Sequence, residues 1–342
     1  MSTVPANPLL DSSVIPTIDT RVQLRGRDGD VAVPVMATGT WAWGDSQIWD
    51  YKEEDFENIK LAFLEALEQQ GGFFDTAEVY AKGESERIIG RIIKSLTPEQ
   101  RAKIHIATKW LPIPSPSNPF FFTPGLVSGL KKSLARLGLD SVDLYQIHGP
   151  IGFHSWEAQG RELAECVKQG LTKTVGVSNF SKEQLIKISD VLESHGVPLA
   201  SNQIELNLIR QYPLRSGLIE EMNKRGVVCL AYSPLAQGRL TGKYSAANPP
   251  TSGRRFSNIP MNLVDPLVEG MREIAEKRNV SIGAIALNWV LSKGAIPLGG
   301  AKNASQAKQN AQALGFRLTE EEITRLETLG LEGTKTTWWQ KG

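Results

Sequence analysis

The sequence predicts an α/β fold in which eight parallel strands, each followed by a helix, form a closed barrel. Short apolar, strand-like segments alternate with segments of helical periodicity along most of the 342 residues. Short connections between such units argue for a parallel sheet, and eight units argue for closure. An open doubly wound sheet is the alternative, but no Gly-x-Gly-x-x-Gly motif follows the first predicted strand. The predicted architecture is therefore the (β/α)8, or TIM, barrel.

An N-terminal hairpin is predicted before the barrel. Residues 21–24 and 31–33 flank Asp28-Gly29, and Asp-Gly between short alternating runs is a strong hairpin signal. The polar, proline-bearing residues 1–20 lack the basic and apolar regions of a secretory signal. We therefore divide the chain into an N-terminal extension, 1–20, and a single barrel domain, 21–342.

Eight short segments have the apolar character of buried strands. The predicted strands are 35–39, 73–75, 104–109, 142–148, 173–178, 201–206, 227–232 and 295–298. Two long loops, 111–124 and the segment from the seventh strand to about 261, follow the third and seventh strands. They lie on the face of the barrel that carries the strand ends, where lids over a substrate are expected.

The intervening segments have helical spacing. In residues 54–69, for example, Ile59 and Phe63 lie on one apolar face, and Thr319 with Glu322 forms a capping box before the last helix. The predicted helices are 54–69, 85–96, 126–137, 156–169, 182–194, 214–225, 266–278, 282–291, 305–314 and 320–329.

The composition of the chain limits the kinds of molecule that it is expected to bind. The formal net charge is +1, which gives no support for nucleic-acid binding, and no apolar run approaches the ~20 residues that a membrane span needs. Cys166 and Cys229 match no metal or redox spacing, so we predict no metal site. We expect a monomer or weak homo-oligomer with a small-molecule substrate. The expected location is the cytoplasm, or a plastid if a transit peptide has been removed.

Four polar side chains stand at the ends of neighbouring strands. Asp75 ends the second strand, with Tyr80 in the loop after it, Lys109 ends the third and His148 ends the fourth. Because barrel chemistry takes place at the C-terminal strand ends, these four residues form the candidate catalytic group. For Asp75 and Tyr80 alone, a helix cap and a packed ring are the structural alternatives.

The chemistry of this group follows from its charges. Asp75 offers Lys109 a carboxylate partner, and a buried ammonium lowers the pKa of a neighbouring phenol from its usual value of about 10. Tyr80 then becomes a usable proton donor, and His148 can orient a carbonyl oxygen. No side chain can supply the electrons that reduction requires, so a hydride donor is also needed.

The second half of the chain carries polar strand ends that suit such a donor. Asn179 and Gln203 have amides for a nicotinamide carboxamide, and Tyr232 offers a ring face. The turn that begins at Ser233 suits a pyrophosphate through its backbone amides. Gly299 to Asn303 precedes a helix and is typical of a phosphate site.

These features together resemble the aldo-keto reductases. The matching stretches are Gly72–Tyr80 with Glu86 and Gly90, Thr108–Lys109, Gln146–His148, Gly176–Phe180, Tyr232–Leu235, Leu240–Lys243, and Gly300–Asn303 with Gln306 and Asn310. They occur in family order, and their combination is specific although each alone is weak. Trp41–Gly44 and Ala236–Lys243 look most like the chloroplast and cyanobacterial members, with plant pyridoxal reductase a more distant likeness.

The resemblance implies further expectations. It implies that the hairpin closes the bottom of the barrel, that Asp75, Tyr80, Lys109 and His148 form the family tetrad, and that NADPH binds without a Rossmann motif. The residues expected to bind cofactor are Gly39, Thr40, Trp41, Asp75, Ser178, Asn179, Gln203, Tyr232, Ser233, Pro234, Leu235, Gln237, Gly238, Lys243, Gly300, Lys302, Gln306 and Asn310. Lys302 offers a cation for a 2′-phosphate, which favours NADPH over NADH.

The predicted function is the NADPH-dependent reduction of an aldehyde or ketone to the alcohol. An NADP(H)-binding redox-sensing or regulatory subunit with little turnover is the alternative. A barrel hydrolase would need paired carboxylates or metal ligands at neighbouring strand ends. In this chain Asp75 has no second carboxylate at the neighbouring ends, and Glu205 is remote. Several aromatic residues either wall a substrate pocket or pack in loops. They are Trp110, Phe120, Phe121, Phe122 and Trp156, and the pair Trp338-Trp339 either packs on the barrel mouth or contacts a partner.

Overall fold

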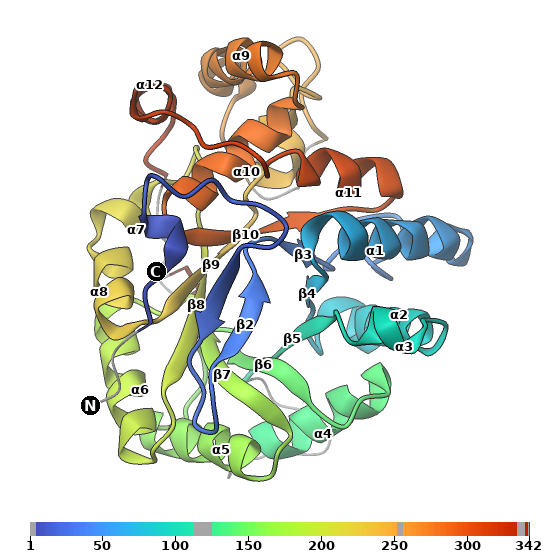
Figure 1. Cartoon of the computed structure of the whole chain (residues 1–342), viewed down its shortest axis with the longest axis vertical. Helices are drawn as coiled ribbons and strands as arrows, with labels where there is room; N and C mark the ends of the chain where they lie inside the picture. Colours follow the sequence, from blue (N-terminus) through green and yellow to red (C-terminus); the bar gives the residue numbers. More distant parts are fainter. Residues whose placement is uncertain (1–4, 113–124, 252–255, 257, 334–338, 341) are drawn as a thin grey trace.

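A computed structural model describes residues 5–112, 125–251, 256, 258–333, 339, 340 and 342. Its centre is a closed, all-parallel barrel of eight strands (Figure 1). The strands are β3 (Ala37–Gly39), β4 (Phe73–Asp75), β5 (His105–Trp110), β6 (Val142–Ile147), β7 (Thr172–Ser178), β8 (Leu199–Glu205), β9 (Val228–Tyr232) and β10 (Ala295–Gly300). Closure comes from the pairing of β10 with β3. The predicted TIM-barrel fold is confirmed.

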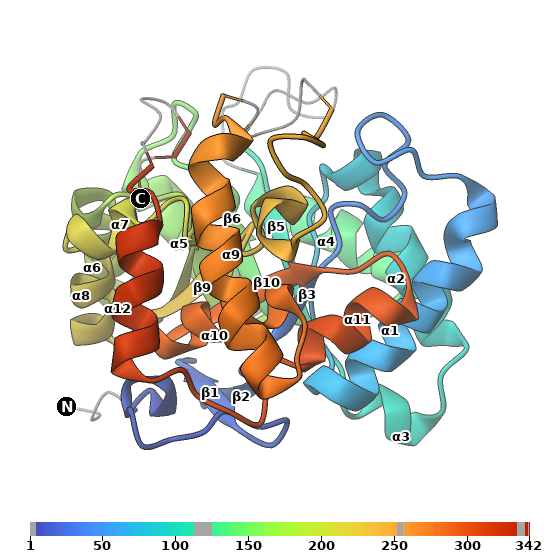
Figure 2. The same cartoon turned by 90° about the horizontal axis from the view of Figure 1, so that it is seen from above.

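Helices surround the barrel (Figures 1 and 2). They are α1 (Phe56–Gln70), α2 (Glu84–Lys94), α3 (Pro98–Arg101), α4 (Leu126–Leu137), α5 (Trp156–Lys168), α6 (Lys182–Ser194), α7 (Tyr212–Arg215), α8 (Leu218–Arg225), α9 (Met261–Arg278), α10 (Ile282–Ser292), α11 (Ala304–Ala311) and α12 (Glu320–Leu329). Short 3-10 helices are η1 (Pro8–Leu10), η2 (Glu53–Asp55), η3 (Tyr80–Gly83) and η4 (Ala236–Thr241).

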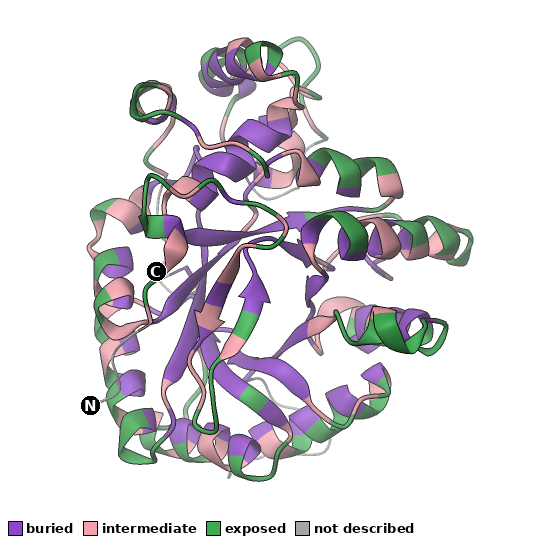
Figure 3. Cartoon of the chain, viewed as in Figure 1, coloured by how far each residue is buried: buried purple, intermediate pink, exposed green. Residues whose placement is uncertain are grey.

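The core has two layers, because each strand buries one face inside the barrel and one against the helices. Inside the barrel, Phe73, Leu144 and Leu230 belong to one buried cluster, while Phe63 and Phe74 belong to the layer between strands and helices. The rings of Phe63 and Phe74 are stacked, with their centroids 3.9 Å apart. Figure 3 shows that the barrel strands are mostly buried, and that many of the exposed residues lie on the outer faces of the helices.

The hairpin of β1 (Arg21–Leu24) and β2 (Val31–Pro34) covers one end of the barrel (Figure 2). Val22, Leu24 and Val33 are buried, and they belong to the cluster that fills the barrel interior. This end is the bottom, where the barrel strands begin. The predicted hairpin is confirmed, and it seals the interior from below.

Part of the predicted N-terminal extension also packs on the barrel. Leu9 is fully buried, and the side-chain amide of Asn7 donates a hydrogen bond of 2.8 Å to the Gly294 carbonyl. The Arg317 guanidinium donates to the carbonyls of Leu9 and Val14, at 2.9 and 3.1 Å. The division into an extension and one barrel domain stays a prediction.

Several elements differ from the sequence-based expectations, among them the short helix α3, which was not predicted. The helix predicted at 214–225 is interrupted, because Gly217 adopts a left-handed φ of 73° between α7 and α8. Helix α9 begins at Met261 rather than at Pro266, which lies inside the second turn. The η4 turn, at 236–241, lies in a segment expected to be loop.

Across the described parts of the chain, no helix combines the length and the apolar character that crossing a bilayer would require.

Candidate active site

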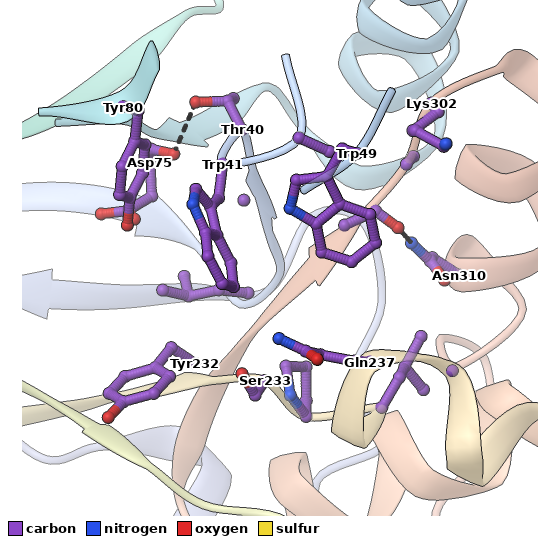
Figure 4. Close-up of a pocket in the computed structure, with 18 of the residues that line it drawn as sticks. Thr40, Trp41, Trp49, Asp75, Tyr80, Tyr232, Ser233, Gln237, Lys302 and Asn310 are labelled. Carbon is purple, nitrogen blue, oxygen red and sulfur yellow. Dashed lines mark hydrogen bonds between the residues drawn. The ribbon is translucent and has the colours of Figure 1, made fainter. Parts of the chain in front are cut away.

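A cavity of about 1040 Å³ opens at the C-terminal ends of the barrel strands. Every residue predicted to bind cofactor lines it, as do Tyr80 and His148. Lys109 is fully buried and lies behind the wall. Figure 4 shows the cavity as a long cleft, with Asp75 and Tyr80 towards one end and Lys302 and Asn310 towards the other. We call these the carbonyl end and the phosphate end.

The carbonyl end is built around a buried ion pair. Strands β4 and β5 are neighbours in parallel register, with Asp75 opposite Ala107, so Lys109 follows two residues later on the same side. Lys109 Nζ lies 2.5 Å from Asp75 Oδ1, and it also donates a 2.7 Å hydrogen bond to the Thr76 carbonyl. Both side chains are almost completely shielded from solvent. The pair forms as the strand-end pattern predicted.

Further donors hold the Asp75 carboxylate. The amides of Gln203 and Gln146 donate to Asp75 Oδ2 at 2.9 and 3.3 Å. The carboxylate therefore has partners on both oxygens, which keeps its orientation fixed. Gln203 also lines the cavity, and its amide nitrogen donates to Asp75, while its contact with a carboxamide stays a prediction.

Tyr80 meets this pair from the loop after β4. Lys109 Nζ donates to the Tyr80 hydroxyl at 3.3 Å. The three residues that follow have left-handed backbones, with φ of 48° at Ala81, 55° at Lys82 and 87° at Gly83. Left-handed L-residues cost about 1–2 kcal/mol each, so the fold maintains a strained turn directly after the phenol.

Electrostatics set the charges of two members of the group. Burial alone would lower the pKa of the Lys109 ammonium, but Asp75 and Tyr80 outweigh burial and raise it. Burial, with the nearby charge of Lys109, holds the pKa of His148 well below its usual value of 6.5. Near neutral pH the site therefore contains a charged lysine and an uncharged imidazole.

His148 stands next to the phenol. Its ring lies edge-on to Tyr80, with centroids 5.6 Å apart, and its carbonyl accepts a 3.4 Å hydrogen bond from the Asn179 amide. Strand β6 ends at Ile147, one residue earlier than predicted, so His148 is the first residue of the loop. The four predicted catalytic residues are thus brought together at one end of the cavity.

Asn179 and Tyr232 form the middle of the cleft. Asn179 has a left-handed φ of 62°, and its side-chain oxygen accepts a 2.8 Å hydrogen bond from the Tyr232 hydroxyl. The Asn179 amide also donates to Ser178 Oγ at 3.1 Å. These contacts fix the Tyr232 ring in the position that Figure 4 shows, along one side of the cleft.

The turn after β9 is strained as well. Ser233, Ala236 and Gln237 have φ of 50°, 46° and 53°. The amides of Ala236 and Gly238 bond within the turn, to the carbonyls of Ser233 and Leu235. Those two amides therefore already have partners, and the binding of a pyrophosphate by this turn stays a prediction.

The phosphate end is formed by β10 and α11. Lys302 is exposed, and its backbone N–H donates to Gln306 Oε1 at 2.8 Å. Asn303 caps α11 by accepting from the Gln306 N–H at 2.9 Å. Asn310 lies behind, where its amide donates to the Gly300 carbonyl at 3.2 Å. An exposed cation beside a capped helix N-terminus suits a phosphate group.

Sequence reasoning missed two tryptophans of the cavity wall as binding candidates. Trp49 lies on the loop before α1 and lines the cavity near Lys302. Trp339 packs on the barrel mouth, one of its two predicted alternatives, with its ring 5.6 Å from that of His148. A side chain at Gly149 would lie 2.8 Å from the Trp339 ring, so this packing is close. An isolated aromatic residue in a long loop gives no periodic signal that would reveal it.

The structure decides between the two alternatives for two of the other aromatic candidates, Trp110 and Trp156. Trp110 is buried in the layer between strands and helices, and Trp156 packs against Phe180 with centroids 5.3 Å apart. Neither lines the cavity, so loop and core packing is the correct alternative for both. Phe120, Phe121, Phe122 and Trp338 lie outside the described residues.

Comparison with known proteins identifies the family. A family model described as "Aldo/keto reductase family" matches residues 35–330. The chain belongs to the aldo/keto reductase family. It is therefore an oxidoreductase, and the predicted resemblance is confirmed.

Individual relatives agree with this assignment. The chloroplastic pyridoxal reductase of Arabidopsis thaliana is 34% identical over 324 residues, covering 90% of this chain and 86% of that protein. The structure of a glycerol dehydrogenase from Gluconobacter oxydans has a TM-score of 0.77 at 28% identity, covering 93% of this chain and 98% of that chain. A Bombyx mori aldo-keto reductase in complex with NADP has a TM-score of 0.69 at 25% identity, covering 94% and 95%.

Proposed function

We propose that this protein reduces an aldehyde or ketone to the alcohol with NADPH, and that Tyr80 is the proton donor. The observation that carries the proposal is the buried Asp75–Lys109 pair, whose ammonium lies 3.3 Å from the Tyr80 hydroxyl. Such an ammonium stabilises the phenolate that remains after a proton has left. An isolated structural tyrosine would not need a fully buried lysine beside it.

The cleft fits the cofactor that the family and the NADP complex of the Bombyx mori relative suggest. Lys302 and the N-terminus of α11 would hold an adenosine phosphate, Tyr232 would support the nicotinamide ring, and Asn179 would meet its carboxamide. The exposed Lys302 cation favours NADPH, because NADH lacks the 2′-phosphate. When bound, the cofactor supplies the hydride that side chains cannot.

The residues of the chain would then manage the proton and the substrate. Tyr80 donates a proton to the carbonyl oxygen as negative charge develops on it. Lys109 keeps a positive charge beside the phenol, and Asp75 keeps Lys109 charged and oriented. His148, uncharged near neutral pH, donates a hydrogen bond to the same oxygen and so orients the carbonyl.

The walls at the carbonyl end favour an uncharged substrate with an apolar or aromatic body. Near Tyr80 the described lining residues include Trp41, Val79, Leu111 and Trp339, and none of these four is charged. We infer that pyridoxal and neutral aromatic aldehydes are better substrates than phosphorylated aldehydes. A comparison of kcat/KM for pyridoxal and pyridoxal phosphate tests this inference, and a preference for the phosphate would overturn it.

The decisive experiment measures NADPH oxidation with a panel of aldehydes, together with NADPH binding, for the wild type and Tyr80→Phe. The variant should bind NADPH within about twofold of the wild type and lose turnover by roughly 10²–10⁴-fold, because it lacks the proton donor. Tyr51→Phe is the matched control, since it removes a phenol that donates a hydrogen bond to the exposed Glu53 and does not line the cavity. Unchanged turnover in Tyr80→Phe would reject the assignment.

The same experiment addresses the alternative of a redox-sensing or regulatory subunit. That alternative predicts tight NADPH binding without turnover across the whole panel. Membership of an oxidoreductase family and the complete carbonyl-end constellation favour the enzyme.

A further inference from the structure

The loop between β3 and α1 reaches over the cleft from a rigid base. Trp43 is fully buried, and its indole N–H donates a 2.8 Å hydrogen bond to the Ala301 carbonyl beside Lys302. Gly44 has a φ of 86°, and a side chain there would lie 2.8 Å from Glu84. The start of this loop is therefore fixed to the phosphate end of the barrel mouth.

The tip of the loop is also ordered by its own hydrogen bonds. Asp45 Oδ1 accepts from the backbone N–H groups of Gln47 and Ile48, at 2.8 and 2.9 Å. The Asp45 carbonyl accepts from the Tyr51 N–H at 3.1 Å, which closes the loop around Trp49. The indole of Trp49 thus projects from a folded turn.

That turn brings Trp49 to the cleft. Its ring lies edge-on to Trp41, with centroids 5.7 Å apart, and Lys302 Nζ lies 5.9 Å from the ring centroid. Figure 4 shows the indole between Trp41 and Asn310, on the opposite side of the cleft from Gln237. A dinucleotide that extends from Tyr232 to Lys302 must pass between Trp49 and Gln237.

We infer that Trp49 is a cofactor-binding residue that covers the adenosine-phosphate half of bound NADP(H) and slows its release. The inference rests on the proposed function and extends it to a residue outside the predicted site. An indole supplies a large apolar surface at a cleft edge, and its ring face attracts the neighbouring ammonium. Trp49 therefore both shields the ligand and keeps the Lys302 cation next to its phosphate.

Trp49 should affect the release of the cofactor and not the chemical step, because Trp41 lies between Trp49 and the Tyr80 end of the cleft. Loss of the Trp49 indole should therefore change how long the cofactor stays, and not the rate of the chemical step. A residue with a merely structural role would alter both rates or neither.

The test measures NADPH dissociation by mixing the complex with excess NADP⁺ and following the fluorescence of NADPH. Trp49→Ala should dissociate about tenfold faster than the wild type, and Trp49→Phe by a smaller factor. Ile48→Ala is the matched control, since Ile48 is exposed on the same turn and does not line the cavity. Single-turnover reduction at saturating NADPH should stay within about twofold in every variant.

Binding measurements with the two halves of the cofactor show which half Trp49 contacts. Trp49→Ala should weaken binding of adenosine 2′,5′-bisphosphate by about the same tenfold and leave nicotinamide mononucleotide unaffected. Equal dissociation rates in Trp49→Ala and the wild type, or an equal loss for both fragments, would overturn the inference. Failure of the wild type to bind NADPH at all would instead overturn the proposed function.

Discussion

The two ends of the cleft handle charge in opposite ways. At the carbonyl end, Asp75 and Lys109 are almost completely buried and contact each other at 2.5 Å. At the phosphate end, Lys302 is exposed, and its ammonium forms no ion pair with a described residue. A lysine side chain is thus buried at the carbonyl end and exposed to solvent at the phosphate end.

This difference follows from what each end must do. Favouring the ionised form of a phenol requires a charge in a poorly solvated place, where its field is not screened. Capturing a phosphate from water requires a cation that is open to solvent and free to meet the ligand. Buried and exposed lysines should therefore respond very differently to the same substitution.

Substitution of the buried lysine should have the largest effect. Lys109→Met leaves the Asp75 carboxylate without its charge partner, so we expect a loss of about 3 kcal/mol in the free energy of unfolding. Turnover should fall by roughly 10³-fold or more, because both the ammonium and the geometry of Tyr80 are disturbed. Urea unfolding and NADPH oxidation measure the two effects.

A double variant sharpens this prediction. Asp75→Asn combined with Lys109→Met removes both charges, and it should recover part of the lost stability without recovering turnover. If the stability lost in the double variant equals the sum of the losses in Asp75→Asn and Lys109→Met, the two side chains are not energetically coupled, and the prediction is contradicted.

Substitution of the exposed lysine should affect binding and not stability. Lys302→Met should weaken NADPH binding by roughly 10–100-fold, the value of one charged contact to a phosphate, and leave NADH binding unchanged. The free energy of unfolding should change by less than about 0.5 kcal/mol. Lys308→Met, at an exposed lysine on α11 that does not line the cavity, is the control. A marked loss of stability in Lys302→Met would contradict the comparison.

The smallest expected effect concerns pH. Because the pKa of His148 is held below 6.5 in the folded protein, the unfolded chain takes up a proton below pH 6.5 that the folded chain does not. Above about pH 6.5 His148 is uncharged in both the folded and the unfolded chain, so it does not change the free energy of unfolding. As the pH falls from 6.5 towards the folded pKa of His148, the free energy of unfolding decreases. The limiting slope is about 1.4 kcal/mol per pH unit.

Urea unfolding of the wild type and His148→Gln at pH 7 and pH 5 measures this contribution. The variant should lose less stability than the wild type over that interval, by up to about 2 kcal/mol. His195→Gln serves as the control, because His195 lies at the surface beside Glu157. Parallel losses in the wild type and His148→Gln would contradict the assignment of a buried, uncharged imidazole.

Local sequence determined the barrel and the residue types at its strand ends. Alternating strand and helix patterns are short-range properties, and eight parallel units have few ways to bury their apolar faces. Once the barrel was predicted, Asp75, Lys109 and His148 were expected at the same edge, and the structure brings them together there.

Only the tertiary structure decided which groups face the cleft and which are used internally. Gln203 lines the cleft, and its amide nitrogen also donates to Asp75, 128 residues away in the chain, a contact that no local pattern indicates. Trp49 and Trp339 reach the cavity through loops whose paths depend on distant partners such as Ala301 and His148. Side-chain direction in irregular segments is set by such long-range contacts, and local periodicity carries no information about them.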